Sequence, residues 1–300
     1  MNSTFLGYAR LARPANLPTA AADILAGVAI GGIFASGVTS DFLGSVLFTH
    51  ILCLMFSSVF LYAGGVILND VFDFKIDQVE RPERPIPSGV VPIAAATLYG
   101  SITLVIGILL AFLVSSISGG VAVALAMAIL LYDGIAKKYD FFGPLSMGLC
   151  RGINLLLGMS ILGDFNYWFM AIIPIVYIFA ITLISRGEVH GENKNHIVLA
   201  GVLYGMVILA VASIAFLYTD DLIFSLLFLV VFAFTVLRPL VKAHSVNSPE
   251  NIKKAVMAGV ISLILLDSSI AVVFSDWWYG LIILALLPVS KGLSKLFAVT

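Results

Sequence analysis

Apolar runs long enough to cross a lipid bilayer follow one another along almost the whole chain, and they restrict the possible folds more than any other feature. A helix needs roughly 20 apolar residues to span the hydrocarbon core, and only helices or closed barrels pair all their backbone groups there. The runs occupy residues 16–34, 42–68, 93–114, 120–136, 144–162, 168–184, 197–217, 222–237, 252–274 and 277–289. The sequence therefore predicts an all-α polytopic membrane protein with nine transmembrane helices. The short last run is expected to form a tenth span or to lie in the membrane interface.

Composition supports this fold class. Hydrophobic residues make up 61% of the 300 residues and charged residues 11%, whereas soluble domains carry about 25% charged residues. No soluble part is left over, so we expect residues 1–300 to form a single transmembrane domain among membrane lipids. The chain has no basic domain or stripe, which argues against nucleic acid as a partner.

The connections between the apolar runs indicate how the chain is oriented. Lys and Arg occur before the first run and in alternate connections after it, and the opposite connections contain Asp but no Lys or Arg. Because Lys and Arg favour the cytoplasmic side of a membrane, we expect a cytoplasmic N-terminus and an active site on that side. Lys291 and Lys295 favour a cytoplasmic C-terminus, which requires the tenth span.

A densely charged stretch follows the second run. Asp70, Asp73 and Asp77 are spaced i, i+3 and i+7, which on a helix places all three carboxylates on one face. Such a cluster attracts a cation, and magnesium is typically bound by one or two carboxylates together with phosphate oxygens. Arg81 and Arg84 follow, and guanidinium groups fit phosphate well. The pattern predicts a magnesium–diphosphate site at the membrane surface.

An ordinary solvated loop is the alternative interpretation of this stretch. However, three acids in register, an asparagine at position 69 and two arginines are more than such a loop needs. Charges are also costly near hydrocarbon. We therefore favour a functional site.

Two further connections on the same side carry candidate residues. Tyr132 and Lys137 lie at the end of the fourth run, followed by Lys138; the lysines either anchor the helix at the interface or contact a diphosphate. After the sixth run, Glu188 and Glu192 are four residues apart and share a helical face. A solvated loop explains this glutamate pair nearly as well as a site does.

Three charged residues lie well inside the apolar runs, away from their ends: Asp23, Arg151 and Asp267. Because charge is expensive in hydrocarbon, each is expected to face the bundle interior, a partner or a polar cavity. A structural ion pair between Arg151 and one of the acids is as well supported as a catalytic role. Glycines in the same run, at 148, 152 and 158, predict close helix packing.

These residues together resemble the UbiA superfamily of intramembrane prenyltransferases. The first motif of that family, N-D-x-x-D-x-x-x-D, is complete here, and so is its continuation of an arginine and R-P-[IL]-x-S-G. The matching residues are Asn69, Asp70, Asp73, Asp77, Arg81, Arg84, Pro85, Ile86, Ser88 and Gly89. Further family positions are matched by Arg13, Pro14, Asn16, Tyr132 and Lys137. Asp133 stands where the family usually has serine.

The second family motif, D-x-x-D-x-x-x-D, is altered in this chain. Its positions are Ser185, Glu188 and Glu192, so two acids remain and the first is lost. Arg186 and His190 are also unusual there. This form of the motif resembles the EboC-like branch of the superfamily.

The resemblance implies helices around a central cavity, capped by the two motif loops, in which Mg²⁺ assists transfer of a prenyl group from an allylic prenyl diphosphate to a small aromatic or lipophilic acceptor. It implies that the catalytic and metal-binding residues are Asp70, Asp73, Asp77, Glu188 and Glu192. The residues expected to bind substrate are Asn16, Asn69, Arg81, Arg84, Tyr132, Lys137, Lys138, Arg151, Asn154 and Arg186. The alternative is a transporter or an isoprenoid-binding membrane protein that has lost catalysis, which the charges inside the bundle would also suit.

Overall fold

The computed structural model describes residues 3–33, 45–188, 191, 193–219 and 221–297. The described residues form helices and no strands, which confirms the predicted fold class. The α-helices are α1 (Ser3–Leu11), α2 (Leu17–Ile30), α3 (Val46–Phe72), α4 (Phe74–Glu80), α5 (Ile93–Phe112), α6 (Ser116–Gly134), α7 (Phe142–Met159), α8 (Ile172–Ser185), α9 (Lys194–Tyr218), α10 (Leu222–Ser245), α11 (Pro249–Ile261), α12 (Leu263–Ala271), α13 (Trp277–Leu284) and α14 (Leu286–Leu296). Short 3-10 helices are η1 (Pro14–Asn16), η4 (Ala136–Lys138), η5 (Ser160–Leu162) and η6 (Trp168–Ala171).

Nine helical segments within the described part of the chain are long and apolar enough to cross a membrane. They coincide with the second to tenth predicted runs, and the last of them, Trp277–Leu296, joins α13 to α14. The predicted short tenth run is therefore of spanning length. The predicted first run, residues 16–34, is represented instead by α2, which has 14 residues. Residue 34, at the end of the predicted run, lies outside the described residues.

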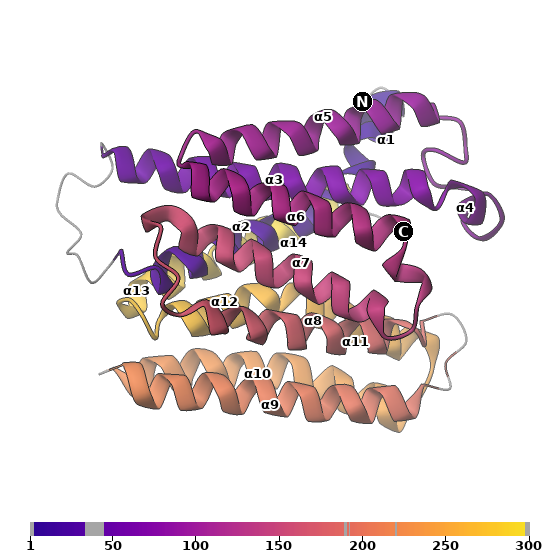
Figure 1. Ribbon diagram of the computed structural model, residues 1–300. Helices are drawn as coiled ribbons and strands as arrows, with labels where there is room; N and C mark the ends of the chain where they lie inside the picture. The colour runs from indigo at the N-terminus through magenta and orange to yellow at the C-terminus, as the bar shows by residue number, and fades with distance from the viewer. Residues whose placement is uncertain (1–2, 34–44, 189–190, 192, 220, 298–300) are drawn as a thin grey trace.

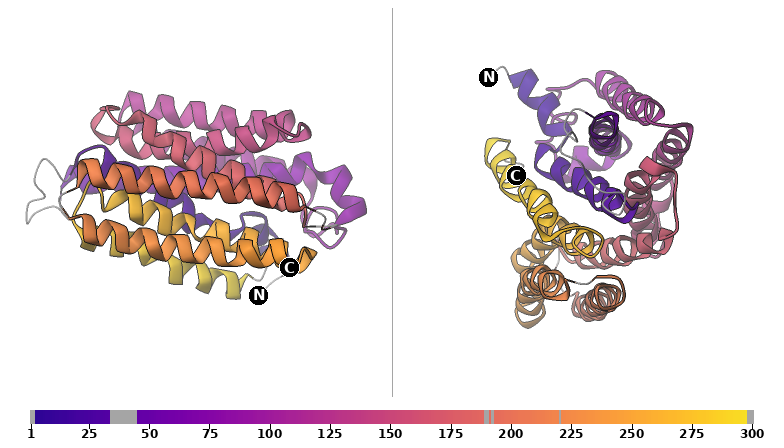
Figure 2. Two further views of the ribbon diagram at one scale, coloured as in Figure 1. Left: turned by 90° about the horizontal axis from the view of Figure 1, so that it is seen from below. Right: turned by 90° about the vertical axis from the view of Figure 1, so that its left-hand side faces the viewer.

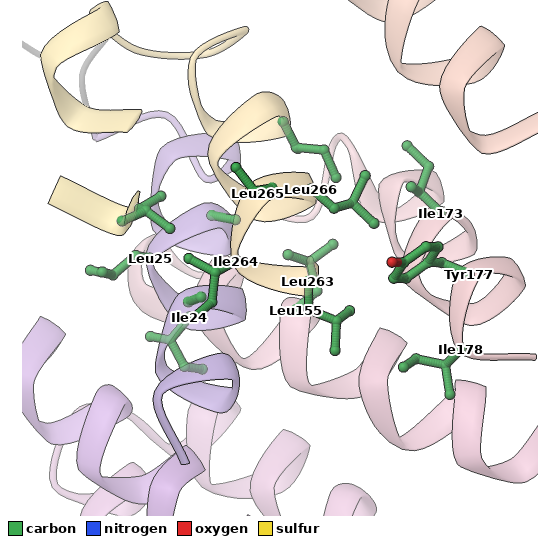
Figure 3. Close-up of a cluster of buried hydrophobic side chains, with 14 of the residues drawn as sticks. Ile24, Leu25, Leu155, Ile173, Tyr177, Ile178, Leu263, Ile264, Leu265 and Leu266 are labelled. Atoms are coloured by element: carbon green, nitrogen blue, oxygen red, sulfur yellow. The ribbon is translucent and has the colours of Figure 1, made fainter. Parts of the chain in front are cut away.

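The helices lie side by side along one direction (Figure 1), and an end-on view shows them grouped around α2 (Figure 2). All residues of α2 from Pro18 to Ile30 are buried, and the helix packs against α3, α7 and α12. The core close-up shows apolar side chains from α2, α7, α8 and α12 meeting, among them Ile24, Leu155 and Ile264 (Figure 3). A helix that is apolar and buried on every side belongs at the centre of a bundle.

Glycines allow α2 and α7 to approach closely. A methyl group at Gly27 would lie 2.3 Å from the carbonyl oxygen of Leu155, and one at Gly158 would lie 2.5 Å from that of Ile24. On the other side of α7, a methyl group at Gly148 would lie 2.6 Å from the oxygen of Ile175. The predicted close packing of this run is confirmed, since neither face has room for a larger residue.

Other helices form the apolar exterior. In each of α5, α9 and α10, 28% of an apolar stretch of 18 residues is buried in the protein. Helices α9 and α10 lie together at one edge of the bundle (Figures 1 and 2). Exposed side chains there include Leu109, Leu209 and Phe234. Because lipid is as apolar as these side chains, they need no protein partner in a membrane.

Candidate active site

The three aspartates of the charged stretch lie where α3 ends and α4 begins. Asp70 is in the last turn of α3, Asp73 is the junction residue with φ −86° and ψ 1°, and Asp77 is in α4. The prediction that they share one face of a continuous helix is therefore wrong. Asp is a weak helix former because its side chain competes for nearby backbone groups, and spacing alone does not reveal a break at Asp73.

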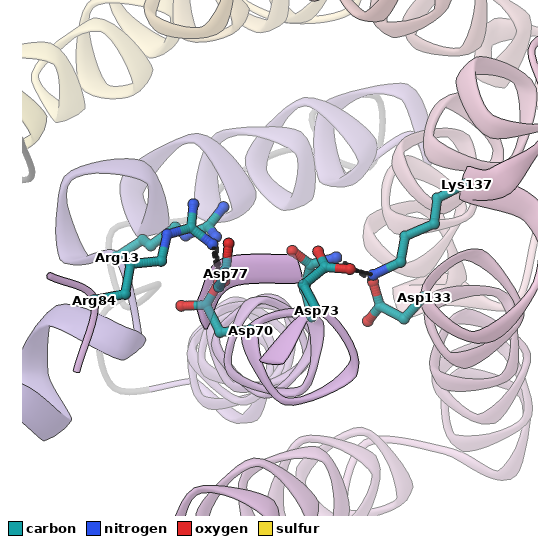
Figure 4. A network of polar contacts seen from close by, with 8 residues as sticks. Arg13, Asp70, Asp73, Asp77, Arg84, Asp133 and Lys137 are labelled. Carbon is teal, nitrogen blue, oxygen red and sulfur yellow. Dashed lines mark hydrogen bonds and ion pairs between the residues drawn. The ribbon is translucent and has the colours of Figure 1, made fainter. Parts of the chain in front are cut away.

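Arg13 and Arg84 contact Asp70 and Asp77 from one side (Figure 4). Arg13 Nη2 donates to Asp70 Oδ1 at 2.7 Å. Arg84 Nη1 lies 3.1 Å from the same oxygen and 2.7 Å from Asp77 Oδ2. The side chains of Asp70 and Asp77 are 8% and 5% exposed. Burying an unpaired carboxylate is costly, so the two guanidinium groups compensate for the burial of both charges.

The backbone of Arg13 is strained. Its φ of 46° and ψ of 62° are in the left-handed region, which residues other than glycine rarely adopt and which is further disfavoured before a proline such as Pro14. The turn is held because Arg13 N donates to Arg10 O and Asn16 N donates to Arg13 O, both at 3.0 Å. Burial lowers the pKa of Arg13, but Asp70 and other neighbours raise it, and the net pKa lies above its ordinary value.

Asp73 points to the opposite side of the junction, toward the end of α6 (Figure 4). Lys137 Nζ lies 2.6 Å from Asp73 Oδ1. Nearby, Asn69 Nδ2 donates to Asp133 Oδ1 at 2.7 Å. The charged stretch is thus joined to α1 and η1 through Arg13 and to α6 and η4 through Lys137 and Asp133.

A cavity of about 300 Å³ lies beside this cluster, inside the bundle. Pockets that bind small ligands start at about this size. Its polar lining residues are Arg13, Asn16, Thr19, Ser58, Tyr62, Asn69, Tyr132, Asp133, Arg151, Asn154 and Thr182. The apolar ones include Leu125, Ile129, Ile178, Ile181 and Leu263. Five predicted substrate-binding residues therefore meet in one cavity, namely Asn16, Asn69, Tyr132, Arg151 and Asn154.

Arg151 is held by a buried polar network on one wall of the cavity. Its Nε lies 2.7 Å from Asp23 Oδ2, and its Nη2 donates to Thr19 O at 2.7 Å. Asn154 Nδ2 donates to the same Asp23 oxygen at 2.7 Å. Both Asp23 and the nearby Asp267 are at most 1% exposed, and Asp23 Oδ1 and Asp267 Oδ2 have no hydrogen-bond partner among the described residues. Of the two interpretations of Arg151, the structural ion pair is confirmed.

A match to a known family model decides the family. The model of the UbiA prenyltransferase family matches residues 24–190, more than half of the chain. The chain belongs to the UbiA prenyltransferase family. The aspartate cluster, Tyr132, Lys137 and most of the cavity wall lie within the matched part.

Curated relatives of this UbiA family member include digeranylgeranylglyceryl phosphate synthases of archaea. The one from Methanococcoides burtonii is 38% identical over 157 residues, which is 52% of this chain and 55% of that protein. The one from Saccharolobus solfataricus is 25% identical over 225 residues, 68% of this chain and 79% of that protein. The chain thus spans about half the length of the first of these relatives.

Solved structures share the fold at lower identity. A structure described as giving insights into digeranylgeranylglyceryl phosphate synthase in membranes has a TM-score of 0.65 and 20% identity, covering 91% of this chain and 99% of that one. A UbiA homolog from Archaeoglobus fulgidus bound to DMAPP and Mg²⁺ has a TM-score of 0.61 and 14% identity, covering 93% and 99%. Together with the nine apolar helices, family membership indicates an integral multi-pass membrane protein.

The carboxylate oxygens of the cluster are the kind of ligand that magnesium prefers, although the three aspartates do not converge on one point. Among the described residues, no three or more His, Cys, Asp and Glu side chains converge as a metal site. Asp70 and Asp77 face Arg84, whereas Asp73 faces Lys137. Since Mg²⁺ usually takes one or two protein carboxylates and completes its shell with phosphate oxygens and water, these separated aspartates suit binding together with a diphosphate.

The altered second motif of this UbiA family member is placed only in part. Glu188 is half-buried; burial raises the pKa of its carboxyl group, and Lys253 and Arg81 oppose that rise. Glu192 lies outside the described residues. Arg186 is paired with Asp140, at 3.3 Å between Nη1 and Oδ1, and donates to the carbonyl of the same residue.

The remaining predicted residues divide clearly. Arg84 and Lys137 reach the aspartates, whereas Arg81 and Lys138 are exposed and Arg186 is not part of the cavity wall. Which basic side chains reach the aspartates depends on the kink between α3 and α4, and the spacing of residues in the sequence does not predict that kink.

Two charged residues of the site, Arg13 and Asp133, were missing from the predicted set, as were the cavity residues Thr19, Ser58, Tyr62 and Thr182. Both charged residues carried a signal in the sequence. Arg13 belongs to the R-P pair near the N-terminus, and Asp133 departs from the serine usual at its position.

Proposed function

We propose that this protein transfers a prenyl group from an allylic prenyl diphosphate to a small lipophilic acceptor bound within the membrane, with Mg²⁺ at the aspartate cluster. Family membership supports the reaction class, and the names of the curated relatives describe prenyl transfer products.

One observation carries the proposal more than any other. Arg13 and Asn69 belong both to the aspartate cluster and to the cavity wall. The cluster and the cavity are therefore parts of one site, with charge at one end and apolar side chains such as Ile129 and Ile181 along the rest. An allylic diphosphate has the same division, since an anionic head is joined to an apolar tail.

The basic residues of the cluster are placed to bind the diphosphate. Arg13, Arg84 and Lys137 now pair with carboxylates and would each gain phosphate oxygens as additional acceptors. Asp70, Asp73 and Asp77 would hold the magnesium ion, which supplies positive charge to the departing diphosphate. These charges lie where negative charge develops as the allylic C–O bond breaks, so they favour the transition state.

The apolar wall contributes by excluding water. After the C–O bond breaks, the allylic cation would react with any nearby water before it met the acceptor. Side chains such as Leu125, Ile178 and Leu263 line the cavity between α6, α8 and α12. Shielding of this kind prevents side reactions of reactive intermediates.

The acceptor is proposed to be lipophilic. The expectation of an aromatic acceptor draws no support from the relatives, whose name describes a glyceryl phosphate carrying two geranylgeranyl groups. Glu188 would either help to bind a second magnesium ion or accept the acceptor's proton, as its half-buried position near Arg81 allows.

We further propose that the N-terminus and the site face the cytoplasm. The α3–α4 junction, the end of α6 and the end of α8 lie at one end of the bundle (Figure 1). Lys and Arg are concentrated in these connections, which agrees with the preference of basic residues for the cytoplasmic side.

Release of diphosphate tests the proposal. Purified protein in lipid nanodiscs would be incubated with geranylgeranyl diphosphate, Mg²⁺ and a membrane lipid extract, and both released diphosphate and prenylated lipid would be measured. We expect magnesium-dependent release and a lipid heavier by one prenyl unit. Asp70→Asn and Asp73→Asn are expected to abolish both while inserting normally. A transporter or binding protein releases no diphosphate, and full activity in either variant would remove the metal–diphosphate assignment.

A further inference from the structure

Asp133 differs from Asp70, Asp73 and Asp77 because it forms no ion pair with a basic side chain among the described residues. Asp70 and Asp77 are paired with Arg84, and Asp73 is paired with Lys137. Within the described part of the chain, Asp133 forms no ion pair, and its one hydrogen bond is that from Asn69 to Oδ1 at 2.7 Å. The second oxygen, Oδ2, is buried and has no hydrogen-bond donor among the described residues.

This unpartnered oxygen belongs to a wall of the cavity. Asp133 is 2% exposed and lines the cavity together with Asn69 and Tyr132. Buried polar atoms almost always have a partner, and leaving one without a partner is costly. The orphaned oxygen therefore points to a ligand that brings a donor into the cavity.

We propose that Asp133 binds the hydroxyl group of the prenyl acceptor, and that the acceptor is accordingly an alcohol that reacts through oxygen. This inference rests on the proposed prenyl transfer. A single orphaned oxygen suits a hydroxyl group, which brings one donor, better than an ammonium group, which brings three. A ring carbon that reacts as the nucleophile of an aromatic acceptor brings none.

The position of Asp133 suits this role. It lies beside Asp73 and Lys137, at the end of the cavity where the diphosphate head would bind (Figure 4). The carbon that reacts is the one bonded to the diphosphate, so a hydroxyl group held at Asp133 would lie next to it. Holding the two reacting groups together in this way is a large part of catalysis.

As the bond from the reacting carbon to the diphosphate oxygen breaks, the diphosphate would leave with the electron pair, the hydroxyl oxygen would form the new C–O bond, and the hydroxyl proton would pass to Asp133. Of the two roles proposed for Glu188, binding of a second magnesium ion would then remain.

The role also predicts how the site selects its acceptor. A site with a buried acceptor atom rejects analogues that lack the matching donor, because the atom is then left without a partner. Methylating the hydroxyl group of the acceptor should therefore weaken binding strongly, although the rest of the molecule is unchanged. Replacing Asp133 should remove this discrimination.

The experiment compares two probes in wild-type protein and in variants. Geranylgeranyl diphosphate with Mg²⁺ is the donor, geranylgeranylglyceryl phosphate with one free hydroxyl is the acceptor, and its methyl ether is the competitor. In wild type we expect the methyl ether to bind at least tenfold more weakly than the acceptor, from its inhibition constant. In Asp133→Ala we expect the two to bind within about threefold of each other, with the KM for the donor unchanged.

Two further variants keep the test decisive. Asp133→Asn retains a carbonyl oxygen and is expected to preserve more discrimination than Asp133→Ala, which a merely structural role would not predict. Asp164→Ala removes an exposed carboxylate from another connection and should behave as wild type. Thermal unfolding of each variant, followed by tryptophan fluorescence, shows whether a loss reflects folding.

The outcomes separate this inference from the proposed function. Discrimination retained in Asp133→Ala overturns the role of Asp133, as does a changed magnesium requirement in that variant, which would make Asp133 a metal ligand. Prenylation by the wild type of a ring carbon in 4-hydroxybenzoate, and of no alcohol, also overturns it and leaves prenyl transfer standing. If the wild type releases no diphosphate with any acceptor, the proposed function fails and this inference fails with it.

Discussion

Among single side chains, two acids buried inside the bundle, Asp23 and Asp267, differ in their partners. Asp23 Oδ2 lies 2.7 Å from Arg151 Nε, whereas Asp267 forms no ion pair among the described residues. A charge buried in hydrocarbon needs an opposite charge beside it, and for Arg151 that charge is on Asp23.

Because Arg151 is paired with Asp23 and not with Asp267, two similar substitutions should differ in their effect on stability. Asp23→Asn leaves Arg151 buried without its counter-ion and should lower the free energy of unfolding by about 3–5 kcal/mol. Asp267→Asn breaks no ion pair among the described residues and should change the unfolding free energy by less than about 1 kcal/mol. Unfolding in mixed micelles with increasing denaturant measures both. Equal losses in the two variants would contradict the assignment of the charge to Asp23.

Arg84 connects two acids, and this geometry cannot be replaced by a single point charge. Its Nη1 lies within 3.1 Å of both Asp70 and Asp77. Lysine keeps the charge but lacks the planar, branched group, so Arg84→Lys should raise the KM for the prenyl diphosphate by about tenfold, a loss of about 1.4 kcal/mol. Steady-state kinetics measure the KM, and Arg10→Lys, at an exposed position of α1, is the matched control. An unchanged KM would show that Arg84 serves only the fold.

Residues of the site could be recognised from the sequence where they stand close together in it, but contacts between distant residues could not. The aspartates, Asn69 and Arg84 were recognisable because they stand close together in a chain otherwise poor in charge. The pairing of Asp73 with Lys137 and of Asp70 with Arg13 joins residues more than fifty positions apart. Such contacts depend on how helices pack, which local spacing does not specify.

At the level of helices, the contact between α2 and α7 is set by glycine. A methyl group at Gly27 would meet the backbone of Leu155 at 2.3 Å, and a backbone atom cannot move aside as a side chain can. Gly27→Ala should therefore destabilise the protein by about 1–3 kcal/mol. Gly120→Ala in α6 is the control, because nothing lies within 4 Å of its added methyl group. Thermal unfolding compares the two, and equal stability would contradict the close packing.

The helices themselves were largely predictable, because runs of about 20 apolar residues have few other folds available. The residues at which the helices end were less predictable. The second apolar run was predicted to stop at residue 68, whereas α3 continues to Phe72, so Asn69 and Asp70 lie in the same helix as the apolar run. Composition marks where hydrocarbon ends, but a helix can continue beyond that point when its polar side chains find partners, as Asp70 does with Arg13.

For the whole molecule, helix α14 packs against η1 and α2 beside the site. Ser290 in α14 donates to the carbonyl oxygen of Ala15 at 2.6 Å, between the cluster residue Arg13 and the cavity residue Asn16. The packing of α14 on η1 and α2 closes the bundle. No local feature of the sequence predicts that α14 packs against the segment that carries Arg13 and Asn16.

The proposed orientation predicts labelling from opposite sides of the membrane. Cysteine at Ser88 lies in the connection after α4, and cysteine at Asp164 lies between α7 and α8; both positions are exposed. In a background with Cys53 and Cys150 replaced, a membrane-impermeant maleimide should label position 164 in intact cells and position 88 only after the membrane is opened. The reverse pattern would place the site on the outer side.

The account as a whole depends on one binding event, the capture of a magnesium diphosphate by the acids and cations where α3 meets α4. Its most direct measurement is calorimetric titration of geranylgeranyl thiolodiphosphate, which resists ionisation, into protein in nanodiscs. We predict binding that requires Mg²⁺ and that weakens at least tenfold in Asp73→Asn, about 1.4 kcal/mol. Equal affinity with EDTA present, or in Asp73→Asn, would contradict the account.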